Sequence, residues 1–380
     1  MGGLWRLFVF LSSNQSITAY ADPEIYHKLK GVSIMKKKIL SLVMAVIMII
    51  SSAMAFTSCA SKAPMIPIVC GETGMNDLCG IATYGVDYYS LGIKAGDMAA
   101  DILLNGADPA TMKVQNDPNP ALSVNKTVAE AIGFTIPESV SSKATGSGAQ
   151  KVARVDSAIV SSGADYTVGI LQLVQHIALD KANEGFQDQL SVRMSAAGKK
   201  VTILDKNANG DEANNITIAD TFVSQNVNLI YTIATSSSQA AVTATAENKI
   251  PVVFNAVTDP VDAGLVASLD APGKNVTGVT DMNPVEKQID LIAELLGKDN
   301  VKIGFLYTSA ETNSVMQVNM GKTHCDSKGY TYVEKGIVDM NDIESALAAL
   351  VKEGVDAIYI PTDNLLANAS ALVHSTNIGE

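Results

Sequence analysis

The most constraining feature of this sequence is an alternation of strands and helices that stops at one end of the chain and resumes near the other. Near the C-terminus, residues 355–364 (VDAIYIPTDN) predict a buried strand and a polar turn, and an apolar helix then runs to about His374. Near the N-terminus, residues 63–72 (APMIPIVCGE) predict a short β-branched strand without a helix before it. Joining Glu380 to Lys62 would restore one unbroken alternation. The order therefore predicts a circular permutation, which is tolerated when the original termini lie close together at the surface.

A short repeat points the same way. Ser61, Lys62 and Ala63 recur as residues 142–144, the last of which begins ATGSGAQ, a stretch that is typical of a flexible leader. We therefore interpret 64–140 as a displaced C-terminal part of the domain and 141–165 as a flexible linker.

Composition and charge restrict the class of protein. A hydrophobic content of 47% with 17% charged residues is typical of globular α/β proteins, and 380 residues suffice for two lobes with separate cores. The net charge of -12 argues against nucleic acid or an anionic membrane surface as partner, because both require basic patches.

Residues 35–59 (MKKKILSLVMAVIMIISSAMAFTSC) resemble a signal peptide of the lipoprotein type, with lysines, an apolar stretch and small residues before Cys59. Cys59 is then the expected lipidation site. The alternative is an uncleaved membrane anchor. Either interpretation places the rest of the chain outside the cytoplasm, and 1–34 are interpreted as a non-native upstream segment.

Periodicity in the rest of the chain predicts two lobes, each a parallel sheet covered by helices, with lobe 1 at 166–281 and lobe 2 at 282–380. A connector is expected at 273–284, and 64–140 is expected to contribute to both lobes. The predicted strands start at Tyr166, Lys199, Val227, Ile250, Val301, Tyr330 and Val355. The predicted helices cover 89–104, 178–196, 212–225, 239–247, 285–296, 314–328 and 341–352.

Ligands of open parallel sheets bind beyond the carboxyl ends of the strands, so the residues that follow each strand are the candidates for a site. They are mostly hydroxyl, amide and carboxylate side chains. The candidates are Glu72, Tyr84, Asp87, Gln172, Thr235, Ser236, Gln239, Thr258, Asp259, Ser309, Asn313, Asp363 and Asn364.

Several candidates also have a purely structural interpretation. The run Thr235–Ser238 between a strand and a helix suits a carboxylate or phosphate, but one of these residues is expected to cap its own helix. Asp363 is equally a helix cap, and Asp259 before Pro260 is equally a turn former. Tyr84, Tyr88 and Tyr89 offer rings for an aromatic ligand or for core packing.

Catalytic and metal sites find little support in the sequence. His176, His324 and His374 are scattered, and His176 alone sits at a strand end, as a polar lining residue. A calcium-like loop at 205–216 ends in Ile216, where a bidentate glutamate is needed. We therefore expect no cofactor, no metal and no enzyme activity. A disulfide between Cys70 and Cys79 and buried free thiols both stay open.

At this point the sequence resembles a family, the extracytoplasmic substrate-binding proteins of ABC importers that includes tryptophan- and tyrosine-binding lipoproteins. The resemblance covers nearly all of 64–138 and 166–380. It is carried by YTVGILQLVQHIALDKANEGF, ANGDEANN, IATSSSQAA, PVVFNAVTDPVDAGLV, GKNVTGVTDMNPVEKQIDLI, KIGFLYTSAETNSV, DAIYIPTDN, IPIVCGE and IATYGVDYYSLG. The family places the IPIVCGE portion after the PTDN helix, which agrees with a permuted order.

The resemblance implies a two-lobe fold of the type I periplasmic binding protein kind, with an amino-acid-like ligand between the lobes. It implies that Thr235, Ser236 and Gln239 hold the ligand carboxylate, and that Asp363 and Glu72 hold the ammonium. The implied walls are Thr258, Ser309, Asn313, Tyr84 and Asp87.

We therefore predict a lipid-anchored, monomeric binding protein that closes on an aromatic or other hydrophobic amino acid and delivers it to an ABC permease. The alternatives are a sensor whose closed form is read by a membrane receptor, an exported enzyme on the same scaffold, and a nonfunctional rearranged product.

Overall fold

The computed structural model describes residues 65–146 and 150–379. The chain divides into the units Met1–Lys62 and Ala63–Glu380, and only the second is described below. The predicted signal peptide, Cys59 and the upstream segment 1–34 lie outside the described residues. Among the residues that are described, no helix is both long and apolar enough to cross a membrane.

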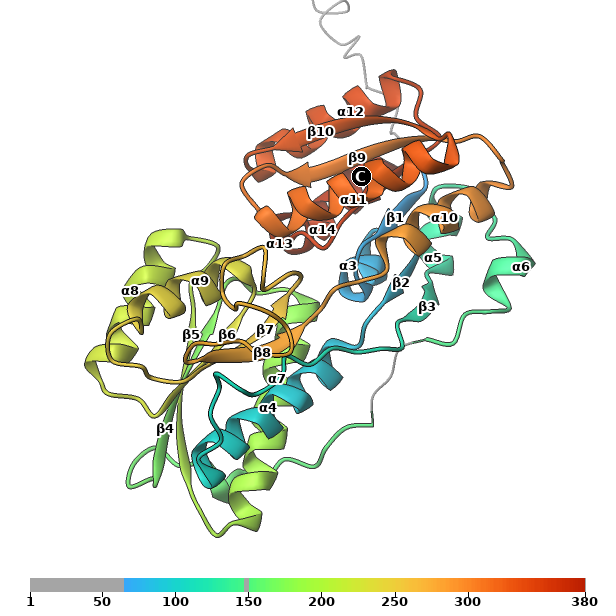
Figure 1. The fold of residues 1–380 in the computed structure, drawn as a ribbon. Helices are drawn as coiled ribbons and strands as arrows, with labels where there is room; N and C mark the ends of the chain where they lie inside the picture. The colour runs from blue at the N-terminus through green and yellow to red at the C-terminus, as the bar shows by residue number, and fades with distance from the viewer. Residues whose placement is uncertain (1–64, 147–149, 380) are drawn as a thin grey trace, which may run out of the picture. The chain divides into compact units, whose positions relative to one another are not determined.

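The first lobe is built on a parallel sheet with the strand order β5-β4-β6-β7-β8 (Figure 1). Its strands are β4 Tyr166–Gln172, β5 Val201–Asn207, β6 Leu229–Ile233, β7 Val252–Val257 and β8 Val276–Thr280. The helices that cover it are α4 Tyr88–Asn105, α7 Ile177–Ala196, α8 Glu212–Ser224 and α9 Thr235–Ala244. One hydrophobic cluster lies between this sheet and α4 and α7, and another between the sheet and α8 and α9. Strand β8 forms within the range that was expected to be only a connector.

The second lobe has a sheet with the order β10-β9-β11-β1-β2-β3. Its strands are β1 Ile68–Cys70, β2 Ala82–Gly85, β3 Ala121–Val124, β9 Lys302–Thr308, β10 Thr331–Ile337 and β11 Ala357–Ile360. Its longer helices are α10 Val285–Leu296, α11 Thr312–Lys328, α12 Ile343–Lys352 and α14 Ser370–Ile378. The shorter helices are α3 Thr73–Leu78, α5 Lys126–Ala131, α6 Glu138–Ser141 and α13 Asn364–Asn368. Only the edge strand β3 runs antiparallel to its neighbour, so the predicted fold class of two helix-covered, mainly parallel sheets is confirmed.

The segment in front of the linker takes part in both lobes. Strand β1 lies between β11 and β2 and pairs with β11 in parallel, with Ile68 opposite Ile358. Helix α4 instead packs against α7 of the first lobe. The chain passes between the sheets at 86–87, 116–120 and 281–284, and again between α6 and β4. The Val86 N–H donates to Asn283 Oδ1 (3.0 Å) where the first and third of these segments meet.

Helices α4 and α7 approach closely because glycines lie at their contact. A Cβ on Gly185 would lie 2.2 Å from the Tyr89 carbonyl oxygen, and one on Gly92 would lie 2.3 Å from that of Ala182. Real side chains do not tolerate such distances, so only glycine permits this backbone separation. The contact between the two helices therefore depends on glycine at both positions.

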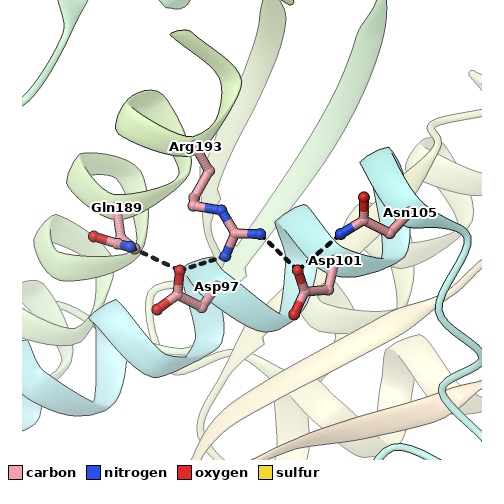
Figure 2. Close-up of polar contacts among 5 residues, drawn as sticks. All are labelled: Asp97, Asp101, Asn105, Gln189 and Arg193. Atoms are coloured by element: carbon pink, nitrogen blue, oxygen red, sulfur yellow. Dashed lines mark hydrogen bonds and ion pairs between the residues drawn. The ribbon is translucent and has the colours of Figure 1, made fainter. Parts of the chain in front are cut away.

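A polar network closes the far end of the same contact (Figure 2). Arg193 on α7 bridges two carboxylates of α4, at 2.7 Å to Asp97 and 2.6 Å to Asp101. Gln189 Nε2 also donates to Asp97, and Asn105 Nδ2 donates to Asp101. We refer to the whole contact between α4 and α7, which includes these glycines and this network, as the α4–α7 seam.

Part of the range predicted to be a linker packs against the first lobe. The Val152 N–H donates to the Tyr89 hydroxyl (2.9 Å), and the Val155 N–H donates to Ser191 Oγ (2.9 Å). Ala158 lies in a short 3-10 helix, Asp156–Ala158, and is buried in the core. Residues 152–158 therefore follow the surface of α7.

Candidate functional site

A cavity of about 390 Å³ lies between the two lobes, beyond the carboxyl ends of their strands. Its walls combine polar and apolar side chains from both lobes, which is the composition of small-molecule sites. The first lobe contributes Leu173, Val174, Asn209, Gly210, Glu212, Thr235, Ser236 and Gln239. The second lobe contributes Thr308, Ala310, Glu311, Thr312, Asn313, Val338, Met340, Asn364, Leu365 and Asn368. We call this cavity the cleft.

One end of helix α9 borders the cleft. The helix begins at Thr235 and not at Gln239, so Thr235 and Ser236 belong to its first turn. Among the described residues no side chain caps this end, because Ala234 is the N-cap, with φ 86° and ψ 162°. The prediction that one of these hydroxyl residues caps the helix is therefore wrong. Uncapped N–H groups and the positive end of the helix dipole favour an anion here.

The neighbouring serines have structural roles. Ser237 Oγ donates to Asn215 Oδ1 (2.8 Å), and Ser238 Oγ bonds to Thr232 Oγ1 and to the Ala234 carbonyl. These bonds hold the first turn of α9 against the lobe, while the backbone N–H groups of that turn stay uncapped.

Part of the cleft wall is apolar. Leu173 and Val174 follow strand β4, and Val338, Met340 and Leu365 border the cavity from the second lobe. Such a wall suits a hydrophobic or aromatic group.

Glu311 is a polar wall residue that the sequence did not single out. It accepts hydrogen bonds from the N–H groups of Asn364 and Leu365, both at 2.9 Å, and from the side chains of Asn364 and Asn313. Burial, and then the nearby Asp363 carboxylate, raise its pKa to about 7. Glu311 thus fixes the two asparagines that border the cleft.

Asp363 is buried and fully engaged by the protein. Its two oxygens accept hydrogen bonds from the N–H and hydroxyl of Thr308, from Ser314 Oγ and from the Leu366 N–H. Burial raises its pKa despite these donors. The helix-cap interpretation fits this arrangement, since Asp363 is the N-cap of α13.

Glu72 is similarly occupied at the start of α3. Its carboxylate accepts hydrogen bonds from the N–H groups of Gly74 and Met75. Burial raises its pKa to about 7, against the lowering effect of these two donors. The ammonium role that the resemblance implied for Glu72 and Asp363 gains no support from their contacts.

The remaining candidates lie in different places. Thr258, Asn313 and Asn364 border a small cavity at the floor of the cleft, which Glu72 and Asp363 also line. Asp259 accepts from the N–H groups of Val261 and Asp262, as a turn former does. Ser309 Oγ donates to the Ile337 carbonyl and borders an outer groove along α11.

Three candidates make contacts within their own lobe. Gln172 bonds to the Val174 carbonyl, to Asp180 and to Asn183. Tyr84 packs against the core of the second lobe, and Asp87 caps α4 by accepting from the Ser90 N–H. The structure does not bring these three to the cleft wall described above.

Metal and disulfide chemistry find no support in the part of the chain that is described. No group of three or more potential metal ligands occurs there. Cys70, Cys79 and Cys325 are all buried and free in the structure, which agrees with the interpretation as buried thiols.

Comparison with known proteins identifies the family. The family model described as ABC transporter substrate binding protein matches residues 24–147 and 167–379. The chain belongs to this family. Its members are extracytoplasmic binding proteins and not enzymes, and they supply the substrate of an ABC transporter.

Individual relatives resemble part of the chain. A tyrosine-binding protein of Clostridioides difficile (strain R20291) is 41% identical over 206 residues, which is 54% of this chain and 59% of that protein. The match thus spans less than two thirds of that relative. An ABC domain from Streptococcus pneumoniae, solved in complex with L-Trp, is 36% identical with a TM-score of 0.50 over 55% of this chain and 70% of that one. A conserved domain protein from Vibrio cholerae is 37% identical with a TM-score of 0.51 over 56% and 71%.

Proposed function

We propose that this protein is the extracytoplasmic solute-binding component of an ABC importer and that it binds an aromatic or other hydrophobic amino acid between its lobes. The observation that carries the proposal is the cleft, in which an uncapped helix end lies beside an apolar wall. The ligand carboxylate binds the first turn of α9, and the ligand side chain lies against the apolar part of the cleft wall. Because both lobes contact the ligand, binding favours the closed arrangement that a permease recognises.

The relatives support the ligand class. One is a tyrosine-binding protein, and another was solved with L-Trp bound. A cleft of about 390 Å³ falls within the usual range for small-molecule sites. A lipid anchor at Cys59 and a monomeric state belong to the same proposal.

The first experiment is a thermal shift of the full chain against single amino acids, sugars and nucleosides. Ligand at a hundredfold excess over its dissociation constant should add about 2.7 kcal/mol to the free energy of unfolding. We expect tyrosine, tryptophan or another hydrophobic amino acid to raise the transition. A cooperative transition that no amino acid moves would overturn the proposed function.

A pair of variants tests the carboxylate site. Thr235→Pro removes the first N–H of α9 at a helix position where proline is tolerated, and Thr235→Val removes only the hydroxyl. We expect the proline variant to bind the amino acid about tenfold or more weakly than the valine variant, because a charge-assisted hydrogen bond is lost. An amine analogue without a carboxylate should not distinguish them. Equal affinities for the amino acid would remove the helix end from the site.

We also propose that the chain order is a circular permutation of the family order. The start of β1 and the end of α14 lie together, since Asn377 Oδ1 accepts from the Ile66 N–H and the Asn377 carbonyl accepts from the Met65 N–H. Strand β1 pairs with β11 in parallel, as consecutive strands of an α/β alternation do. The partial matches also fit this order, since 206 aligned residues is close to the length of the segment 167–379.

The permutation is tested by restoring the family order. A chain that starts at Ala144, continues to Glu380 and is joined to residues 62–143 should fold cooperatively and bind the same ligand as the original. Failure of the reordered chain to fold would contradict the proposal.

A further inference from the structure

A cavity of about 10 Å³ lies at the floor of the cleft. It is large enough for about one water-sized group. Asn313 and Asn364 border both this cavity and the cleft, so the two spaces are adjacent. Asp281, His176 and Tyr88 also line it. We call this space the floor cavity.

Asp281 follows strand β8 and is 1% exposed. Its Oδ2 accepts a hydrogen bond from the Tyr88 hydroxyl at 2.7 Å. Its Oδ1 is buried and has no hydrogen-bond partner among the described residues. Burial raises the pKa of this carboxyl, and the hydroxyls of Tyr88 and Thr258 partly oppose the effect. A buried carboxylate oxygen without a partner is costly and calls for a donor from outside the protein.

His176 supplies a second unused acceptor. Asn364 uses its Nδ2 to donate to Glu311, so its Oδ1 faces His176 Nε2 as an acceptor at 3.3 Å. Nε2 then carries the ring proton, which leaves Nδ1 as an acceptor. Nδ1 is buried and finds no partner in the described part of the chain. Burial also lowers the pKa of His176 to about 4, so the ring is neutral at pH 7.

The other acidic residues of the floor cavity are not available in the same way. Glu72 and Asp363 are occupied by donors of the protein, as described above. None of the residues that line the floor cavity in the described structure is a lysine or an arginine. The lining of the cavity therefore includes two side chains that each have an unpaired acceptor atom, and no lysine or arginine among the described residues.

We propose that the floor cavity binds the ammonium group of the ligand, with Asp281 Oδ1 and His176 Nδ1 as its acceptors. This inference rests on the proposed function and adds the residues that distinguish an amino acid from a plain carboxylic acid. Tyr88 acts as a positioning residue, because its hydroxyl holds the other oxygen of Asp281. A cleft with this floor rejects a ligand that lacks the ammonium, since two buried acceptors would then stay unpaired.

The test compares each amino acid with its analogue that lacks only the amino group. L-tyrosine is paired with 3-(4-hydroxyphenyl)propanoate, and L-tryptophan with indole-3-propanoate, in calorimetric titrations of the full chain. We expect the wild-type protein to prefer the amino acid by about a hundredfold or more, and Asp281→Asn to reduce that preference to less than about tenfold. His176→Phe, which keeps a ring but removes the acceptor, should reduce it by about five- to tenfold.

The chain offers a matched control in Asp188. Asp188 is also buried and also accepts a hydrogen bond from a tyrosine hydroxyl, that of Tyr89, but it lies on α7 in the seam. Asp188→Asn should leave the preference unchanged. Cooperative thermal unfolding of each variant verifies that it folds, and His176→Phe carries the test if Asp281→Asn does not fold.

The outcomes separate this inference from the proposed function. If the wild type binds no amino acid at all, the proposed function and the ammonium site both fail. If it binds amino acids but Asp281→Asn and His176→Phe keep the full preference, only the ammonium site fails. Equal affinity of the wild type for both members of each pair would show that the floor cavity holds water only, which also overturns the inference.

Discussion

Two adjacent tyrosines at the start of α4 each donate a hydrogen bond to a buried aspartate, but the two aspartates differ in the other contacts around them. The Tyr89 hydroxyl donates to Asp188 at 2.9 Å and accepts the Val152 N–H in the α4–α7 seam. The Tyr88 hydroxyl donates to Asp281 at 2.7 Å at the floor of the cleft. In the seam, the Tyr89 hydroxyl connects α4 to α7 and to the linker segment. At the floor of the cleft, by contrast, one carboxylate oxygen of Asp281 has no partner among the described residues.

The difference separates polar groups that hold the fold from polar groups that await a ligand. Native interiors pair nearly all their buried polar atoms, so an unpaired one needs an explanation. The polar groups of the seam need no such explanation. Arg193, Gln189 and the Tyr89 hydroxyl all make their contacts with other residues of the protein. Two acceptors among the residues that line the floor cavity, Asp281 Oδ1 and His176 Nδ1, have no partner among the described residues. Unpaired buried atoms lower the stability of the folded protein, which is the cost of a site preorganised for a ligand.

The largest expected loss of stability comes from replacing a glycine of the seam. Gly185→Ala should lower the free energy of unfolding by about 3 kcal/mol or more, because the new methyl group would meet the Tyr89 carbonyl and force the helices apart. Urea denaturation measures the change. Ser195→Ala, an exposed position on the same helix, should stay within about 0.5 kcal/mol of wild type. A cost below about 1 kcal/mol for Gly185→Ala would show that the seam is loosely packed.

The second prediction concerns how the stability of the protein depends on pH through Glu72, which lines the floor cavity. Its folded-state pKa of about 7 lies above the ordinary value of 4.5, so its ionisation destabilises the folded state. The wild type should therefore lose stability as the pH rises from 4.5 through 7. Glu72→Gln imitates the protonated acid and should remove this loss, leaving the variant more stable above pH 7 by an amount on the order of 3 kcal/mol.

The measurement for Glu72→Gln is the free energy of unfolding as a function of pH for both proteins. Below pH 4.5 the two should agree closely. Parallel curves across the whole range would mean that Glu72 titrates normally and that the N–H groups of Gly74 and Met75 compensate its burial.

The fold was largely predictable because periodicity is a local signal. The helix Val285–Leu296 has the predicted bounds, and the helices that start at Ile177 and Glu212 lie within a residue of the predicted limits. Strand β8 was missed because Thr277 and Gly278 weaken its apolar pattern, and its pairing with β7 decides its structure. Long-range pairing is not visible in a single sequence.

The site was less predictable for a related reason. The rule that ligands bind beyond strand ends would have selected Asp281, had the range 273–284 been recognised as containing a strand. Sequence also cannot tell which carboxylates are already paired. Asp363 and Glu72 stand at strand ends like Asp281, and only the three-dimensional contacts show that the protein occupies their oxygens.

The difference between Asp188 and Asp281 can be tested directly in the protein without a ligand. Asp188→Asn should cost about 1 to 2 kcal/mol, because it weakens a hydrogen bond to a charged group that joins the seam. Asp281→Asn should cost nothing or even stabilise the free protein, because it removes a buried charge with an unpaired oxygen. Both are measured by denaturation in dialysed protein. A larger loss for Asp281→Asn than for Asp188→Asn would mean that Asp281 is a structural residue.

The smallest expected effect concerns the charged end of the seam. Arg193→Met keeps much of the apolar stem but removes both ion pairs, and its partly buried network predicts a loss of about 1 kcal/mol that shrinks in high salt. Lys113→Met removes a single pair, Lys113–Asp270, whose side chains are 71% and 80% exposed, and should cost almost nothing. Urea denaturation at low and high salt distinguishes the two. If both variants lose a negligible amount of stability, the glycines alone hold α4 to α7 and the network of Figure 2 does not stabilise the contact.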